Sequence, residues 1–229
     1  MKVKLVSYSQ PDGEFQEEGI TDAQDLIAFC ARVSNPSNQY NTNTSDKLIR
    51  YLVNNAHWSP LEMVSVCMEI ETTRDIARQI LRHRSFAFQE FSQRYADPTT
   101  DLSFVIREAR LQDPKNRQNS ISINDTTLGG AIIQDEWTTR QESVILAAKS
   151  AYDWAIRNGI AKEQARVVLP EGNTVSRMYV NGTIRSWVHF IQVRSGNGTQ
   201  KEHMEIARQC AVVINKVFPM ASSFVTDWQ

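Results

Sequence analysis

The side chains best suited to binding an anionic ring lie between residues 74 and 94. This stretch has five arginines and no lysine, and its two acids are Asp75 and Glu90, so its formal charge is +3 (five minus two). Phenylalanines alternate with hydroxyl and amide side chains in its second half. A guanidinium group binds phosphate through two parallel hydrogen bonds, and aromatic rings pack on flat ligands. The mixture favours a pocket for a nucleotide-like ligand.

Two simpler interpretations of this stretch are also open. Cations gather at the C-terminal ends of helices, where the backbone carbonyls are negative. Arginine interleaved with aromatic residues also forms surfaces that bind single-stranded nucleic acid. A solvated helix end would be rich in lysine and glutamate, whereas this stretch has no lysine and a single glutamate. The whole chain carries 25 basic and 26 acidic residues, which disfavours a polybasic binder of nucleic acid.

Other common catalytic sites are not predicted. The sequence lacks GxGxxG, GxxxxGKS/T, HExxH and GxSxG. Its four histidines, at positions 57, 83, 189 and 203, do not have metal-ligand spacing, so no metal site is expected. Cys30, Cys67 and Cys210 lie in apolar patterns and are expected to be core residues rather than nucleophiles. Ser92 is expected to bind a ligand, because the sequence positions no base to activate it.

Length and composition predict one domain over residues 1–229. A chain of this length can bury a core without disulfides, and no low-complexity linker divides it. No apolar run approaches the ~20 residues of a membrane helix, and the first residues turn polar too early for a signal peptide. Three cysteines without a CxxC motif fit a reducing compartment. We therefore expect a cytoplasmic protein.

The spacing of apolar residues predicts a mixture of strands and helices. Strands are expected at 1–8, 62–72, 102–106 and 174–180. Helices are expected after a capping box at 21–24, after Ser45, over 73–83, over 130–159 with at most one break, over 184–191, and after a second capping box at 199–202 up to residue 217. Residues 109–129 are polar without a period, which predicts a long, mobile loop. The lack of strict βαβ alternation favours a single α+β domain with an antiparallel-type sheet.

Four segments together resemble the flavin-dependent thymidylate synthase family. Arg82-His83-Arg84, followed after seven residues by Ser92, is similar to the defining RHR-x7-S motif of that family. Residues 31–34 (ARVS) resemble an early family motif, and residues 57–62 (HWSPLE) resemble its H-x-S/T-P-x-E turn. Residues 165–170 (ARVVLP), with 185–194 after them, resemble its C-terminal block, whereas residues 97–160 match weakly.

The resemblance implies an enzyme that methylates dUMP to dTMP. In this family methylenetetrahydrofolate supplies the carbon and NADPH reduces a bound FAD. Hydride then passes to the pyrimidine without a protein cysteine nucleophile, which agrees with cysteines that look structural. The family is a homotetramer whose active sites are assembled from several subunits.

The resemblance also implies roles for individual residues. The implied dUMP ligands are Gln79, Ile80, Leu81, Arg82, Glu90, Phe91, Ser92, Gln93, Arg94, Arg166 and Arg194. The implied FAD ligands are Ser34, Ser59, Arg82, His83, Arg84, Glu90, Thr183, Ile184, Arg185 and His189. Arg194 is the implied catalytic residue, because an arginine near N3 and O2 of uracil stabilises negative charge on the ring.

Some positions depart from the family pattern. Ala87 and Gln89 stand where serine and asparagine are usual, and Thr183 stands where asparagine is common in a trio that binds FAD. His189 replaces an asparagine but can still donate a hydrogen bond. Two other functions remain as alternatives: a non-catalytic binder of single-stranded nucleic acid, and a flavin-storage or regulatory relative. The intact set of arginines disfavours the second.

Overall fold

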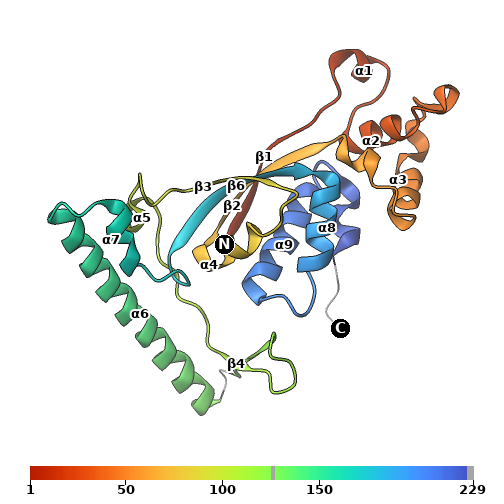
Figure 1. Ribbon diagram of the computed structural model, residues 1–229. Coiled ribbons are helices and arrows are strands. Elements are labelled where there is room, and N and C mark those ends of the chain that lie inside the picture. The colour runs from red at the N-terminus through yellow and green to blue at the C-terminus, as the bar shows by residue number, and fades with distance from the viewer. Residues whose placement is uncertain (125–126, 226–229) are drawn as a thin grey trace.

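The computed structural model describes residues 1–124 and 127–225 (Figure 1). Its central feature is a four-stranded antiparallel sheet in the order β1-β2-β6-β3. The strands are β1 (Lys2–Tyr8), β2 (Ser65–Thr73), β6 (Val175–Thr183) and β3 (Ala87–Glu90). The predicted combination of helices with an antiparallel sheet is therefore confirmed.

The long strands β2 and β6 form the middle of the sheet and fix its register. Ser65 lies opposite Thr183 at one end of the pair, and Thr73 lies opposite Val175 at the other. Alternate residues of β2 are buried because one side of the strand faces the core, as the alternation of the sequence predicts. The helices α4 (Arg74–Ile80), α8 (Ile184–Arg194) and α9 (Lys201–Ile214) pack against this side (Figure 1).

The remaining helices flank the sheet at its two ends (Figure 1). One end carries α1 (Gly13–Glu17), α2 (Ala23–Ala31) and α3 (Ser45–Asn54), with the 3-10 segments η1 (Pro36–Asn38), η2 (Thr42–Thr44) and η3 (Ser59–Glu62). The other end carries α5 (Pro98–Asp101), α6 (Leu128–Arg157), α7 (Lys162–Ala165) and η4 (Arg166–Val168). The chain's last described element is η5 (Pro219–Phe224).

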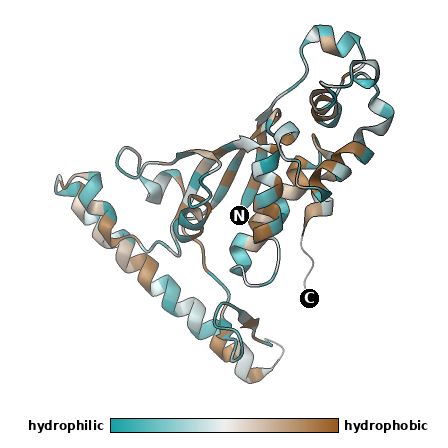
Figure 2. Ribbon diagram, turned by 45° about the vertical axis from the view of Figure 1, so that its right-hand side comes forward, coloured by the Kyte–Doolittle hydropathy of each residue, from teal (hydrophilic) through white to brown (hydrophobic). Residues whose placement is uncertain are grey.

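Helix α6 stands apart from the main core. It runs for 30 residues without a break and displays both apolar and polar residues along its length (Figure 2). A small cluster formed by Tyr152, Ala155, Ala165 and Leu169 packs it against α7 and η4. The predicted helix over 130–159 is confirmed, and the break that the sequence allowed does not occur.

Two segments differ from the sequence predictions because their pairing is tertiary. Residues 102–106 are not a strand and make one antiparallel bridge, between Phe104 and Thr174. The predicted loop over 109–129 contains a short hairpin of β4 (Arg110–Gln112) and β5 (Ser120–Ser122). Residues 125–126 of that loop lie outside the described residues. Strand β3 was not predicted, because its four residues show no clear alternation of apolar and polar side chains. They form a strand because they pair with β6.

The helix starts also differ in detail from the predicted capping boxes. The N-cap of α2 is Asp22, whose carboxylate accepts from the Asp25 backbone N–H at 2.8 Å. The N-cap of α9 is Gln200, whose side chain makes no capping bond because it contacts other side chains. Val33 is exposed because α2 ends before it, at Ala31. Helix α9 ends at Ile214, three residues earlier than predicted.

Within the described part of the chain, no helix combines the length and apolar character needed to cross a lipid bilayer. The residues described likewise contain no cluster of three histidine, cysteine or acidic side chains arranged to hold a metal ion.

Candidate functional site

Three helix ends meet on one face of the sheet. Because β2 and β6 are antiparallel, the helices that follow them, α4 and α8, begin at opposite ends of the sheet and run toward each other. Near their C-terminal ends Arg194 Nε donates to His83 Nε2 at 2.9 Å. The first turn of α9 reaches the same place, where His203 contacts Gln79. We call Gln79, His83, Arg194, Gln200 and His203 the central cluster.

The Gln79 side chain is bound at both ends of its amide. Its Nε2 donates to Gln200 Oε1 at 2.8 Å, and its Oε1 lies 3.2 Å from His203 Nδ1. His203 is fully buried, and the ring of Phe190 packs against both His203 and His83, with centroid separations of 5.6 and 5.0 Å. The amide therefore has one orientation, set by two partners from α9.

Both histidines of the central cluster are held neutral. Burial and then the nearby Arg194 lower the pKa of His83 to about 4. Burial, followed by Arg194 and His83, lowers the pKa of His203 to about 3. His83 Nε2 must accept, because Arg194 Nε can only donate. Arg194 thus keeps its full positive charge beside a neutral partner.

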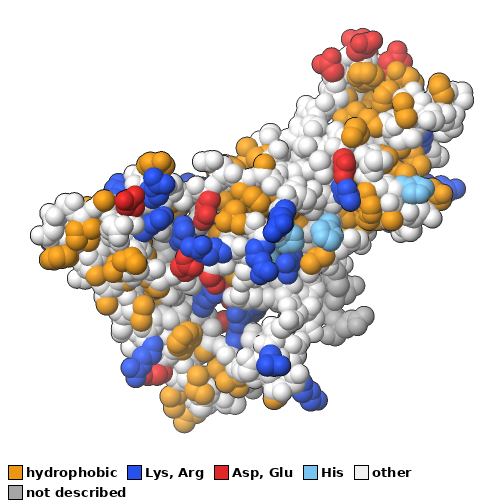
Figure 3. Space-filling model, viewed as in Figure 1, with side chains coloured by type: hydrophobic (Ala, Val, Ile, Leu, Met, Phe, Trp, Pro, Cys, Tyr) orange, Lys and Arg blue, Asp and Glu red, His pale blue; other side chains and the backbone are white. Residues whose placement is uncertain are grey.

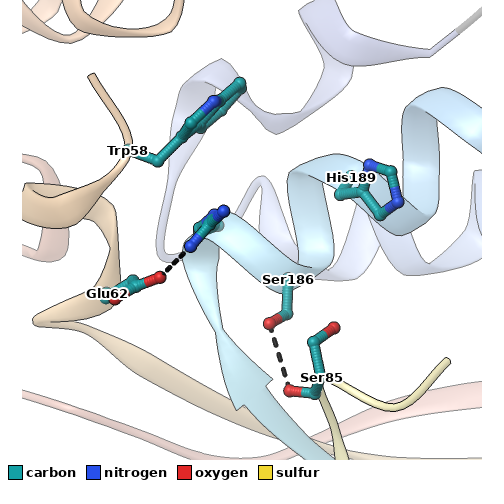
Figure 4. A pocket seen from close by; sticks show the side chains of 6 residues that line it. Trp58, Glu62, Ser85, Ser186 and His189 are labelled. Atoms are coloured by element: carbon teal, nitrogen blue, oxygen red, sulfur yellow. Dashed lines mark hydrogen bonds and ion pairs between the residues drawn. The ribbon is translucent and has the colours of Figure 1, made fainter. Parts of the chain in front are cut away.

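Two predicted FAD ligands, Arg185 and His189, line a cavity of about 330 Å³ at the start of α8 (Figure 4). Glu62 belongs to η3, Trp58 directly precedes η3, and His189 projects from α8 (Figure 4). Arg185 lines the cavity from the first turn of the same helix. Arg185 pairs with Glu62, and Ser186 Oγ donates to the Ser85 carbonyl at 3.2 Å. The indole wall and the guanidinium and imidazole donors fit a flat, anionic cofactor such as FAD.

Gly182 of β6 lies beside Ser186, one of the residues that line this cavity. A Cβ at this position would lie 2.2 Å from a ring carbon of Phe86, so the ring can pack there only against glycine. Phe86 in turn contacts Trp187 and Phe190, with centroids 4.5 and 6.0 Å away. This packing fixes the turn that carries His83, Arg84 and Ser85.

Two predicted dUMP ligands, Gln93 and Arg166, line a cavity of about 380 Å³, which we call the arginine cavity. Its lining residues are Arg74, Arg78, Gln93, Glu163, Gln164, Arg166, Val167, Leu169 and Glu171. Gln93 is only 4% exposed, and its Nε2 has no hydrogen-bond partner among the residues described. A buried amide N–H without a partner is costly, so its presence points to a ligand.

Most cations around the arginine cavity are already paired with acids. Arg78 contacts Glu171, and Arg94 Nε lies 3.9 Å from Glu163. Glu90, expected to contact both ligands, accepts from Ser176 Oγ at 2.7 Å and lies 3.5 Å from Arg74 Nη1. An anion that enters this cavity must compete with these carboxylates.

The other predicted ligands differ in how far their side chains are exposed. The side chains of Ile80 and Ile184 are buried in the main core, so ligands could reach only their backbones, whereas Leu81 packs against the core and is half-buried. Ser59, Arg82 and Arg84 are exposed, Phe91 and Ser92 are half-buried, and Thr183 caps α8 by accepting from the Ser186 N–H. Ser34 is exposed in the turn after α2, and within the described residues no hydrogen bond joins it to another predicted ligand.

Cationic and histidine side chains gather near the middle of one molecular face, over α4 and α8 (Figure 3). Sequence reasoning identified several of these residues but missed Gln200 and His203 of the central cluster. It also missed Arg74 and Arg78 as lining residues. The charge of the 74–94 stretch could have suggested the two arginines, whereas no local pattern marks Gln200 or His203.

Comparison with known proteins identifies the family. The family model described as "Thymidylate synthase complementing protein" matches residues 18–220. A probable flavin-dependent thymidylate synthase of Paramecium bursaria Chlorella virus 1 is 43% identical over the full length of both chains. The chain belongs to the flavin-dependent thymidylate synthase family. The resemblance carried by the RHR-x7-S motif, and the prediction that the chain is an enzyme of this family, are therefore confirmed.

Other family members are similar over most of their length. The flavin-dependent thymidylate synthase of Synechocystis sp. is 43% identical over all of both chains, and that of Thermus thermophilus is 28% identical over 85% of this chain and 68% of its own. Among solved structures, the UMP/dUMP methylase PolB of Streptomyces cacaoi, bound with 5-Br dUMP, has a TM-score of 0.77. It is 24% identical over 97% of this chain and 93% of its own, which supports the shared fold.

Proposed function

We propose that this enzyme converts dUMP to dTMP, with methylenetetrahydrofolate as the carbon donor and NADPH as the reductant of a bound FAD. The observation that carries the proposal is the pairing of a charged Arg194 with the neutral His83, beside the fixed amide of Gln79. This arrangement occurs in a chain that is 43% identical, over its full length, to relatives named flavin-dependent thymidylate synthase.

The substrate would be held by two kinds of contact. Arg94, Arg166 and Ser92 carry the guanidinium and hydroxyl donors that a phosphate needs. Gln79 and Arg194 would contact the uracil ring. Negative charge that develops on the ring oxygens during methylation would be stabilised by Arg194, because its guanidinium is not neutralised by an acid in the central cluster.

The cavity at the start of α8 would hold FAD, which supplies the hydride when reduced. Arg185 and His189 would donate to its phosphates together with the exposed Arg82 and Arg84, and the Trp58 ring would pack against a flat part of the molecule. Arg185 can exchange Glu62 for a phosphate at little cost, since their ion pair is exposed to water.

The cysteines support a mechanism without a thiolate nucleophile. Burial raises the pKa values of the Cys30, Cys67 and Cys210 thiols, so each is less reactive than a free thiol at neutral pH. Cys210 is completely buried in α9, where a ligand cannot reach it.

We also propose that the active site is shared between copies in a homotetramer. Arg78 and Gln79 are neighbours on α4 but lie on different sides of it. Arg78 lines the arginine cavity, whereas Gln79 contacts α9. A single dUMP that uses both the central cluster and the arginine cavity would therefore draw these two halves from different copies.

The absorbance spectrum gives the first test. The purified protein should absorb in the near ultraviolet and blue as an FAD protein does, and should oxidise NADPH in a dUMP-dependent way while forming dTMP from methylenetetrahydrofolate. A protein that takes up no added FAD and forms no dTMP would refute the proposal.

Mixing two variants that are both impaired at low dUMP concentration tests the shared site. Arg194→Ala and Arg166→Ala remove one residue from each half, and co-refolded or co-expressed mixtures should regain part of the wild-type activity. Recovery requires that one site takes its two halves from different copies. If one variant carries a mass tag and native mass spectrometry shows mixed assemblies, a mixture that gains no activity would place both halves in one chain.

A further inference from the structure

A line of side chains leads from the hairpin β4–β5 to the Gln79 amide. Arg110 Nη2 donates to Glu202 Oε1 at 2.7 Å, and Gln200 Nε2 donates to Glu202 Oε2 at 3.0 Å. Gln200 Oε1 then accepts from Gln79 Nε2 at 2.8 Å, and Gln79 Oε1 lies 3.2 Å from His203 Nδ1. The line is largely enclosed: the Arg110 and Glu202 side chains are each 12% exposed.

The charge of Glu202 fixes the direction of every hydrogen bond in this line. An ionised carboxylate can only accept, so Gln200 must turn its Nε2 toward Glu202 and its Oε1 toward Gln79. Gln79 must then donate through Nε2, which leaves its Oε1 facing His203. His203 must donate from Nδ1, since a reversed Gln79 amide would place two carbonyl oxygens against each other.

Glu202 stays ionised in this place. Burial opposes its ionisation, but hydrogen bonds from Arg110, from the backbone and from Gln200 outweigh that effect, so its pKa lies below the ordinary value. The anchor of the line is thus a permanent acceptor at neutral pH.

This line of hydrogen bonds leaves two polar groups of the Gln79 amide without a partner in the line. The amide nitrogen has two hydrogens and the amide oxygen has two lone pairs. The bonds to Gln200 and His203 use one hydrogen and one lone pair. One N–H and one lone pair remain, side by side on the same amide. This pattern complements the edge of a pyrimidine ring, where the N3–H donor adjoins a carbonyl oxygen.

We propose that Arg110, Glu202, Gln200 and His203 form a polarised relay that positions the Gln79 amide for the pyrimidine ring of dUMP. The inference rests on the proposed function for the identity of the ligand. His203 is a positioning residue, because it acts through Gln79.

The cost of the relay argues against a purely structural role. His203 is fully buried, and its Nε2 has no hydrogen-bond partner among the described residues. A buried ring nitrogen without a partner lowers stability relative to an apolar side chain of similar size. An apolar residue would fill the space at less cost, but it would leave the Gln79 amide held by Gln200 alone.

Substitutions at His203 separate a donor role from a packing role. In His203→Asn the side-chain amide N–H lies near the position of Nδ1, whereas His203→Leu keeps the volume but no donor. The purified, FAD-loaded protein is titrated with dUMP in a calorimeter, without folate or NADPH. His203→Leu should bind dUMP about tenfold more weakly than wild type. His203→Asn should bind within about threefold of wild type. Ile206→Val, buried on the same helix, serves as a matched control and should bind dUMP normally.

A double-mutant cycle decides whether His203 acts through Gln79. In a Gln79→Ala background, His203→Leu should cause no further loss of dUMP affinity, because the group that it positions is gone. An equal loss in both backgrounds, or His203→Asn binding as weakly as His203→Leu, would overturn the relay. Binding of dUMP by the wild type distinguishes the two failures: its absence refutes the proposed function itself.

Glu202→Gln supplies the test if His203→Leu does not fold. This variant keeps size and hydrogen bonding but allows either direction along the line, so dUMP should bind several-fold more weakly while the flavin spectrum and melting temperature change little. Unchanged dUMP affinity in a folded Glu202→Gln protein would show that the direction of the relay has no role in binding.

Discussion

The central cluster and the arginine cavity differ in how their arginines are paired. In the central cluster, Arg194 donates to a neutral imidazole, so its charge is not compensated there. Around the arginine cavity, Arg74, Arg78 and Arg94 each face a carboxylate. The arginine of the central cluster thus has a neutral partner, whereas these arginines of the other region are paired with acids.

This difference suggests a division of roles. A guanidinium that must stabilise charge in a transition state works best when no acid neutralises it beforehand. Arg78 and Arg94 can exchange their acids for a phosphate at small cost, because these two ion pairs are exposed to water. We therefore expect changes at Arg194 to affect turnover, and changes around the arginine cavity to affect substrate affinity.

The largest effect is expected for Arg194→Ala. Loss of the uncompensated charge should lower kcat by about 100-fold or more, with the FAD spectrum retained. Steady-state dTMP formation and absorbance of the purified variant measure both quantities. Normal turnover of the variant would show that Arg194 has no part in catalysis and would refute the proposed difference in role between the two regions.

Arg166→Ala should act mainly on binding. Removal of one charge-assisted hydrogen bond to phosphate should raise the KM for dUMP by about 10- to 100-fold, with a smaller change in kcat. Arg157→Ala, in the last turn of α6, removes an arginine that does not line the cavity and is the control. A variant of Arg166 that lost kcat but kept KM would contradict the assigned division.

The neutral histidines predict a pH dependence of stability. Their pKa values are about 4 for His83 and about 3 for His203 in the folded protein, against about 6.5 in the unfolded chain. Between those values the unfolded chain binds protons that the folded protein does not, so stability is lost as pH falls below about 6.5. Urea unfolding at about pH 7 and about pH 5 should show this loss, and His203→Asn should reduce it. An identical pH difference in both proteins would mean that His203 is not held neutral.

The smallest effect is expected for Glu171→Gln. The substitution frees Arg78 from an exposed ion pair, so the free energy of unfolding should fall by less than about 1 kcal/mol. The KM for dUMP should fall by about twofold, because the phosphate no longer competes with this acid. A rise in KM would show that Glu171 assists binding rather than opposing it.

Local sequence patterns predicted most of the elements that carry the site. The alternation in β2 and the apolar spacing of α8 depend on neighbouring residues, so they could be read from the chain. Strand β3 and the hairpin β4–β5 could not, because short segments become strands only when a partner strand pairs with them. The motif RHR-x7-S identified the family, and with it the candidate ligands.

The sequence by itself determined the chemical inventory: a near-neutral chain with an arginine-rich stretch, four histidines without metal-ligand spacing, and cysteines in apolar settings. Only the tertiary structure decided how that inventory is used. It brought His203 and Gln200 to Gln79 across more than 120 positions of sequence, and it placed Arg194 against a neutral His83. Hydrogen-bond direction and pKa depend on burial and on neighbours in space, and neither can be read from the order of residues along the chain.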